Sequence, residues 1–246
     1  MLTTSPGSAH RRSKLLWVVL VLVVLLLAPR CALADTVTFV SNATWNVTDS
    51  SNTSLGPAQA VCLNSSFPAS CPSGATLYGY GGSGWGANLS SIPGAAWIWA
   101  PGVTGSTLDP SFLALTFSQV FSLPGAPLSG TIAVSADDFA SVFVNGNFVG
   151  SVGSTTNVSL AGAAQSALTS FNLLPFLVPG SNTISIVGQN GLNSFSGCTT
   201  NCTYSQDPAG VVFGGTLTST PEPSTLLLLG TGLSGLILRK WKAAPR

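Results

Sequence analysis

The central part of the chain, residues 35–238, contains all seven Asp and Glu residues and no Lys, Arg or His. The eight Lys and Arg residues lie in Met1–Arg30 or Arg239–Arg246, and the one His is His10. The central part therefore has a formal charge of −7, and no carboxylate can form a salt bridge within it. Each carboxylate must stay in water or be satisfied by hydrogen bonds or a metal ion, because an unpaired buried charge is too costly.

This distribution of charge argues against several classes of function. A domain without basic side chains has no groove for phosphate groups, so nucleic acid is not an expected partner. It also lacks the imidazole that commonly serves as a general base, as a zinc ligand or as the partner of a nucleophilic serine. We therefore predict that the protein is not an enzyme.

The first 34 residues have the features of a secretory signal peptide. Basic residues precede the unbroken apolar run Leu15–Ala28, and Ala32–Ala34 reads A-L-A, which fits a signal-peptidase site. We expect export through the Sec translocon, removal of residues 1–34, and Asp35 as the mature N-terminus.

The last residues, 220–246, have three parts. Prolines make the tripeptide Pro221, Glu222 and Pro223 rigid and extended, and Ser224–Leu238 is uncharged and mostly aliphatic. Fifteen helical residues reach roughly 22 Å against a hydrocarbon core of about 30 Å, so we predict a short transmembrane helix that anchors the chain briefly. The basic stop that follows, which should remain cytoplasmic, consists of Arg239, Lys240 and Lys242, with Arg246 beyond.

This order of parts resembles the PEP-CTERM sorting tail of Gram-negative bacteria, also described as an ice-binding-protein C-terminal region. The resemblance implies a precursor tethered in the inner membrane, recognition by an exosortase, cleavage near Pro221–Pro223, and release to the cell surface or extracellular matrix. A permanent anchor, in which Gly230, Ser234 and Gly235 form a helix contact, is the alternative.

Four cysteines remain after removal of the leader: Cys62, Cys71, Cys198 and Cys202. Four cysteines allow three pairings. In an oxidising compartment we favour the two local disulfides, Cys62–Cys71 and Cys198–Cys202, because each closes a small loop. Zinc is the alternative, but there is no His, and the two cysteine spacings are unequal.

Residues 35–219 predict one all-β ectodomain. Alternating apolar segments such as Thr36–Ser41 and Leu113–Leu123 are separated by Gly, Pro and Asn turn signals, and Asn145-Gly146 is the strongest hairpin signal. No long amphipathic helix is expected. The pattern favours a two-sheet β-sandwich of about eight or nine strands.

Three segments resemble galactose-binding-like jelly rolls, which are attached to bacterial surface proteins and glycosidases. They are, in order, Trp97–Gly102, Val134–Gly150 and Phe171–Val187. The resemblance implies an accessory sandwich that often binds carbohydrate, sometimes with a structural calcium. Because sugar-binding residues of this family lie in variable loops, none can be assigned here by position.

Two aromatic residues of a glycine-rich segment, Tyr80 and Trp85, are candidates for stacking on a ligand. Their alternative role is to cover one edge of the sandwich. Trp45 and Tyr204 are further candidates for exposed aromatic contacts. Together with many Asn and Ser side chains, they favour binding of polysaccharide or another glycan.

Asp137 and Asp138 form the only adjacent carboxylate pair. Neighbouring strand residues point to opposite faces, so these two would not flank one bond as the carboxylates of a glycosidase do. If both are exposed at a turn, water solvates them. If one is buried, backbone N–H groups or calcium must satisfy it, since calcium takes oxygen ligands.

These observations favour an exported, exosortase-sorted protein of the cell surface or matrix with a non-catalytic sandwich in a structural or adhesive role. A carbohydrate-binding module is the alternative.

Overall fold

The computed structural model describes residues 34–63, 71–82, 84–192, 195 and 197–221. The predicted leader up to Leu33 lies outside these residues, and so do Glu222, Pro223, the predicted membrane segment and the basic stop. Over the described ranges, no helix is long and apolar enough to cross a membrane.

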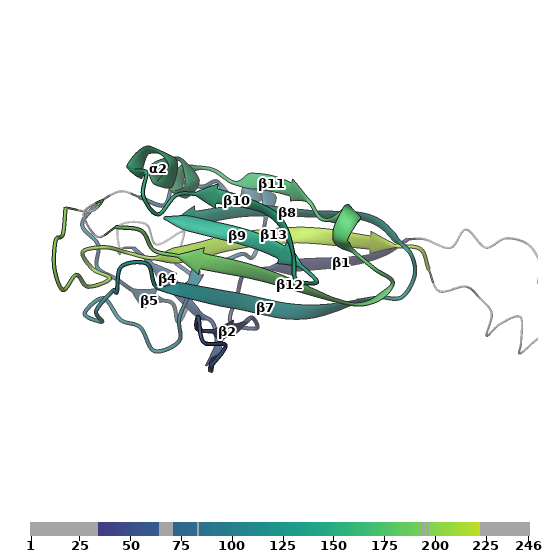
Figure 1. Cartoon of the computed structure of the whole chain (residues 1–246), viewed down its shortest axis with the longest axis horizontal. Helices are drawn as coiled ribbons and strands as arrows, with labels where there is room; N and C mark the ends of the chain where they lie inside the picture. Colours follow the sequence, from purple (N-terminus) through teal and green to yellow (C-terminus); the bar gives the residue numbers. More distant parts are fainter. Residues whose placement is uncertain (1–33, 64–70, 83, 193–194, 196, 222–246) are drawn as a thin grey trace, which may run out of the picture. The chain divides into compact units, whose positions relative to one another are not determined.

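Two sheets pack face to face, which confirms the predicted all-β sandwich (Figure 1). The first sheet has the order β11 (Thr169–Asn172), β8 (Pro127–Asp137), β13 (Gly210–Ser219), β6 (Ile98–Trp99), β4 (Gln59–Cys62) and β5 (Thr76–Leu77), with β1 (Asp35–Val40) also paired to β13. The second has the order β10 (Asn147–Gly153), β9 (Phe139–Val144), β12 (Gly180–Gln189), β7 (Ala114–Leu123), β2 (Asn46–Thr48) and β3 (Ser54–Pro57). Pairing is antiparallel except between β4 and β5.

The core lies between the sheets because alternate side chains of each strand point inward. On β8, Ile132 and Val134 are buried, and on β12 Ile184 and Ile186 are buried. Fully burying such a side chain contributes about 1.5–3 kcal/mol each. The alternation that predicted these strands therefore also identifies the residues that hold the sheets together.

The predicted hairpin at Asn145-Gly146 is present between β9 and β10. Both residues have positive φ, 53° at Asn145 and 79° at Gly146. A two-residue turn of this type needs that conformation, which Asn and Gly adopt more readily than other residues.

Helix α2 (Val158–Ser166) covers the end of β8. Asn157 caps it by accepting hydrogen bonds from the backbone N–H groups of Ser159 and Leu160. Ser135 on β8 donates to the Ala164 carbonyl and fixes the last turn of the helix on the sheet. Two short 3₁₀ helices, η2 (Leu89–Ser91) and η3 (Leu174–Phe176), complete the described helical elements.

Both predicted local disulfides are present. Cys62 and Cys71 are nine residues apart in sequence, with Cα atoms separated by 5.6 Å. Cys198 and Cys202 are four residues apart, with Cα atoms separated by 5.9 Å. Each bridge closes a loop next to the sandwich rather than linking distant strands.

The strands give the sandwich two distinct ends. We call the end that contains α2 and Asp137 the α2 end, and the end that contains Ser219 and η3 the tail end. Figure 1 shows α2 at one end and the tip of the β13 arrow at the other. β8 runs the whole distance between them, and its 11 residues span roughly 33 Å.

Candidate functional site

The adjacent carboxylates lie at the α2 end, where the chain passes from β8 in one sheet to β9 in the other. The peptide bond between them is cis. Asp137 is 4% exposed and Asp138 is 3% exposed, so the solvated turn considered from the sequence is wrong. The pair is buried because this crossover lies beneath α2 and beside the loop that carries Trp85.

One amide serves both carboxylates. Nε2 of Gln165, on α2, donates to Oδ1 of Asp137 and to Oδ1 of Asp138, the latter at 3.1 Å. Nε1 of Trp85 donates to Oδ2 of Asp137 at 2.7 Å, and the backbone N–H of Gly191 donates to Oδ2 of Asp138 at 2.9 Å. The expectation that the two carboxylates point to opposite faces is therefore wrong, since both reach the same side chain.

Burial raises the pKa of Asp137 well above its usual range, and the charge of Asp138 raises it further. Burial also raises the pKa of Asp138, against the lowering effect of hydrogen bonds from Asp137, Gly191 and Gln165. No cation of the ectodomain offsets these effects. Both groups therefore keep a proton to higher pH than an exposed Asp does.

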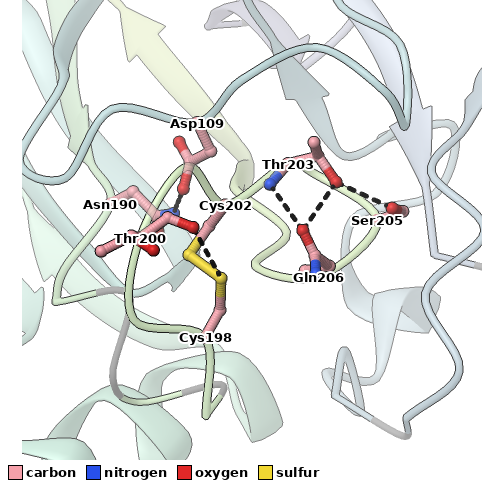
Figure 2. Close-up of a disulfide and its surroundings, with 8 residues drawn as sticks. All are labelled: Asp109, Asn190, Cys198, Thr200, Cys202, Thr203, Ser205 and Gln206. Carbon is pink, nitrogen blue, oxygen red and sulfur yellow. Dashed lines mark hydrogen bonds between the residues drawn. A yellow bond between two sulfur atoms is a disulfide. The ribbon is translucent and has the colours of Figure 1, made fainter.

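A third buried carboxyl, that of Asp109, contacts Asn190, as Figure 2 shows. Asp109 is 3% exposed and Asn190 is fully buried, and Nδ2 of Asn190 donates to Oδ2 of Asp109 at 2.5 Å. Burial raises the pKa of Asp109 to about 8. Asn190 directly precedes Gly191, so one short segment after β12 contacts both carboxyl sites.

The Cys198–Cys202 loop borders the Asp109 site (Figure 2). The backbone N–H of Asp109 donates to the carbonyl of Cys202 at 2.8 Å, and Leu108 forms a β-bridge with Thr203. The disulfide therefore restrains the loop whose Cys202 carbonyl accepts the hydrogen bond from the Asp109 backbone.

A hollow of about 140 Å³ opens over the carboxylate pair. The polar and aromatic side chains that line it are Tyr80, Asp137, Asp138, Gln165, Phe195 and Asp207, and apolar lining comes from Val158, Ala161 and Pro208. Tyr80 is partly exposed, whereas Asp207 is 4% exposed. The hollow thus combines three carboxyl groups, one amide and two aromatic rings.

The aromatic candidates fall into separate environments. Tyr80 lines the hollow, but Trp85 stacks on Trp97 with ring centroids 4.3 Å apart and donates to Asp137. The expected exposure of Trp45 and Tyr204 is wrong, since they are 0% and 1% exposed. Trp45 packs edge-on against a core ring, and Tyr204 accepts a hydrogen bond from Trp99.

Several residues of this site were not predicted from the sequence, among them Asp109, Asn190 and Gln165. Gln165 belongs to a helix whose only local signals are the Asn157 cap and its Ala content. Asp109 and Asn190 are 81 residues apart, and no local pattern links them.

Calcium at Asp137 and Asp138 stays a prediction, and their donor set does not favour it. Each of the four carboxylate oxygens accepts an N–H group, whereas calcium needs six to eight oxygen ligands. Among the residues that the structure describes, no three His, Cys, Asp or Glu side chains gather in a group that could hold a metal ion.

Residues 219–241 match the PEP-CTERM protein-sorting motif. The chain carries a PEP-CTERM sorting tail. This tail implies export through the exosortase pathway with a membrane-anchored precursor. Its match begins at Ser219, the last residue of β13, so the PEP-CTERM tail starts within the folded sandwich.

No curated protein matches the chain. Among solved structures, it is similar to the Streptomyces avermitilis α-L-rhamnosidase complexed with L-rhamnose, at 23% identity over 50% of this chain, with a TM-score of 0.37. It is also similar to the Pleurotus ostreatus lectin in complex with GalNAc, at 20% identity over 51% of this chain and 34% of the lectin, with a TM-score of 0.30. A third is the Bacteroides uniformis β-glucuronidase, at 15% identity over 74% of this chain and 18% of the enzyme, with a TM-score of 0.34. The chain spans 10% of the length of the rhamnosidase.

Proposed function

We propose that this protein is an exosortase-sorted surface protein whose sandwich binds neutral carbohydrate in the hollow at the α2 end. The observation that supports this most is the meeting of Tyr80 with Asp137, Asp138 and Gln165 around one opening. Carboxyl and amide groups form hydrogen bonds with sugar hydroxyls, and an aromatic ring packs against the apolar face of a sugar. The role is adhesive, and the sandwich itself is not catalytic.

The charge of the ectodomain favours a neutral ligand. Residues 35–238 contain no basic side chain, and Asp207 adds a third carboxyl group to the hollow. An acidic polysaccharide would bring further negative charge into this environment without a partner. The volume of about 140 Å³ is below the roughly 300–1,000 Å³ of pockets for drug-sized ligands, so one sugar ring is the expected occupant.

The arrangement of the carboxylates argues against glycoside hydrolysis. A glycosidase places two carboxyl groups on either side of the scissile bond. Here Asp137 and Asp138 accept hydrogen bonds from the same Gln165 amide, so they lie on one side of the opening. A substrate could contact both but could not pass between them.

The sorting tail supports the cellular setting. We propose passage through the Sec translocon, a precursor held in the inner membrane, cleavage by exosortase, and release to the surface or matrix of a Gram-negative cell. Residues 1–34, 35–219 and 220–246 then serve as leader, ectodomain and tail.

A structural role without a ligand is the second candidate. It is favoured by the carboxylate oxygens of Asp137 and Asp138, each of which already accepts a hydrogen bond within the fold. In that case the α2 end is closed by its own contacts, and the protein contributes to a surface coat by its mass and stability.

The test is a glycan array, followed by titration, with the mature protein. We expect neutral glycans to bind, and Tyr80→Ala to weaken binding at least about tenfold, or 1.4 kcal/mol. Phe148→Ala is the matched control, because Phe148 is 56% exposed but lies on β10 outside the hollow. If no glycan on the array binds, the structural role in a surface coat is supported. Selective binding of acidic polysaccharides would contradict the proposal.

A further inference from the structure

The sorting tail begins at residues that the sandwich holds in place. Ser219 is fully buried, and the backbone N–H of Thr220 donates to the carbonyl of Ala126 at 2.9 Å. In return, the backbone N–H of Ala126 donates to the Thr220 hydroxyl at 2.9 Å. The first two residues of the tail are therefore held by the turn that connects β7 to β8.

Few residues separate this fixed point from the predicted membrane segment. Only Thr220–Pro223 lie between β13 and Ser224. Four extended residues reach at most about 14 Å. As long as the tail anchors the precursor, the tail end of the sandwich must therefore stay close to the lipid.

The tail end presents apolar side chains to solvent. Leu128 is 50% exposed, Leu174 is 37% exposed and Val178 is 46% exposed. Hydrogen bonds fix the segment that carries the last two. The backbone N–H of Leu173 donates to the Gly130 carbonyl on β8, and that of Val178 donates to Oδ1 of Asn182 on β12.

Most of the carboxyl groups of the ectodomain lie at the other end of the sandwich. Asp109, Asp137, Asp138 and Asp207 all belong to the α2 end. Among the described residues, Asp35 is the acidic residue at the tail end, where it is the β-sheet partner of Ser219. The tail end therefore brings few carboxyl groups against the interface of a bilayer.

We propose that, in the tail-bearing precursor, the tail end lies on the lipid surface with Leu128, Leu174 and Val178 among the headgroups. Apolar side chains at this depth stabilise contact with a bilayer. Three of them form a weak contact, but the tail keeps their effective concentration at the membrane high. This position holds the α2 end roughly 33 Å away from the bilayer, along the length of β8. Cleavage of the tail removes the tether, and the contact then dissociates.

Fluorescent probes on single cysteines test this orientation. Leu128→Cys and Leu174→Cys report on the tail end, and Leu160→Cys on α2 is the matched control, because Leu160 is 54% exposed at the opposite end. The tail-bearing protein is reconstituted into phosphatidylcholine vesicles without exosortase. In these vesicles, we expect aqueous iodide to quench the probes at residues 128 and 174 at least twofold less than it quenches the same probes on the tail-less protein in detergent-free solution. Spin-labelled headgroups should quench these two probes and leave the probe at residue 160 unchanged.

Three outcomes would overturn the proposal. Equal iodide quenching at all three positions would mean that the tail end stays in water. Protection from iodide that disappears as the ratio of protein to lipid is lowered would show that a second copy of the protein covers the tail end. Protection that requires added exosortase would assign the surface to that enzyme instead. Because these residues are exposed, the Leu128→Ser and Val178→Ser double variant should fold normally and restore iodide quenching of the probe at residue 174.

Discussion

Buried carboxyl groups dominate the chemistry of this domain at the scale of single residues. Asp109, Asp137 and Asp138 are each less than 5% exposed in a region without any cation. Removal from water disfavours the charged form, and hydrogen bonds offset this effect only in part, so their pKa values rise. These Asp side chains therefore act as buried hydrogen-bonding groups in a region that contains no Lys or Arg.

This arrangement predicts a protein that is more stable in mild acid than in base. An unfolded Asp has a pKa of about 3.9, whereas burial raises the pKa of Asp109 to about 8. Between these values the native state binds more protons, so the free energy of unfolding falls as pH rises. The contribution of Asp109 to the free energy of unfolding is complete below about pH 4 and is lost as pH rises through about 8. We expect the melting temperature to fall by several degrees from pH 5 to pH 9.

Asp109→Asn isolates the contribution of that group, because an amide does not titrate. The variant should show a flatter dependence of melting temperature on pH than the parent protein. A parent melting temperature that rises between pH 5 and pH 9 would contradict the assignment.

Gln165 is the side chain on which the carboxylate pair depends. Gln165→Ala removes an amide that serves two buried carboxyl groups, so we expect a loss of about 1–3 kcal/mol in the free energy of unfolding. Gln119→Ala on β7 is the control and should change stability by less than about 0.5 kcal/mol. Denaturant unfolding at constant pH measures both, and equal stability of the two variants would show that the Gln165 amide is dispensable.

The hydrogen bonds to Asp137 and Asp138 predict that calcium does not change the thermal stability of the protein. Every oxygen of the pair already accepts an N–H group, so a cation would have to displace Gln165, Trp85 or Gly191. The melting temperature should therefore be the same in EDTA and in millimolar calcium. A rise in calcium that Asp138→Asn abolishes would instead establish the metal site.

At the scale of elements, the two disulfides stabilise loops rather than the sheets. In the chain-entropy description, removing Cys198–Cys202 costs roughly 2 kcal/mol, and removing Cys62–Cys71 costs slightly more because its loop is longer. Paired Cys→Ser variants and thermal unfolding test this order. Peptide mapping without reduction should recover both local bridges, and a peptide that joins Cys62 to Cys198 would refute the pairing.

Local signals predicted the elements that local physics determines. Alternation identified β1 and β7, and the positive φ that Asn145-Gly146 supports identified the hairpin. The nine-residue α2 was missed, because its sequence is mostly small and shows little difference between its two faces. The β8–β9 crossover was also missed, since a change of sheet leaves the strand pattern on either side unaltered.

The candidate site could be predicted only in part. Tyr80 and the carboxylate pair were found because composition makes them stand out. Gln165 and Asn190 are ordinary polar residues in sequence, and they matter because the fold brings them to the carboxylates over 28 and 81 residues. Pairings at that separation depend on sheet topology, which the local pattern does not encode.

At the scale of the whole molecule, the sorting tail predicts two molecular species. A membrane-bound form should retain residues 220–246, and the surface-released form should lack Ser224–Arg246. Intact-mass analysis of both fractions tests this, with the mass of the ectodomain from Asp35 as the reference. Released protein that carries the complete tail would contradict cleavage.

The attachment of the tail to β13 also determines how the tethered precursor carries mechanical load. β13 pairs with β8 along its full length and with β1 over Asp35–Val40, antiparallel on both sides. A pull on the tail acts along the axis of β13, in shear, so the hydrogen bonds of both ladders bear the force together instead of opening one after another. Force on the ectodomain while the tail still holds it is therefore opposed by the two longest interfaces of the first sheet, and the tether can be cut at its base while the sandwich keeps its shape.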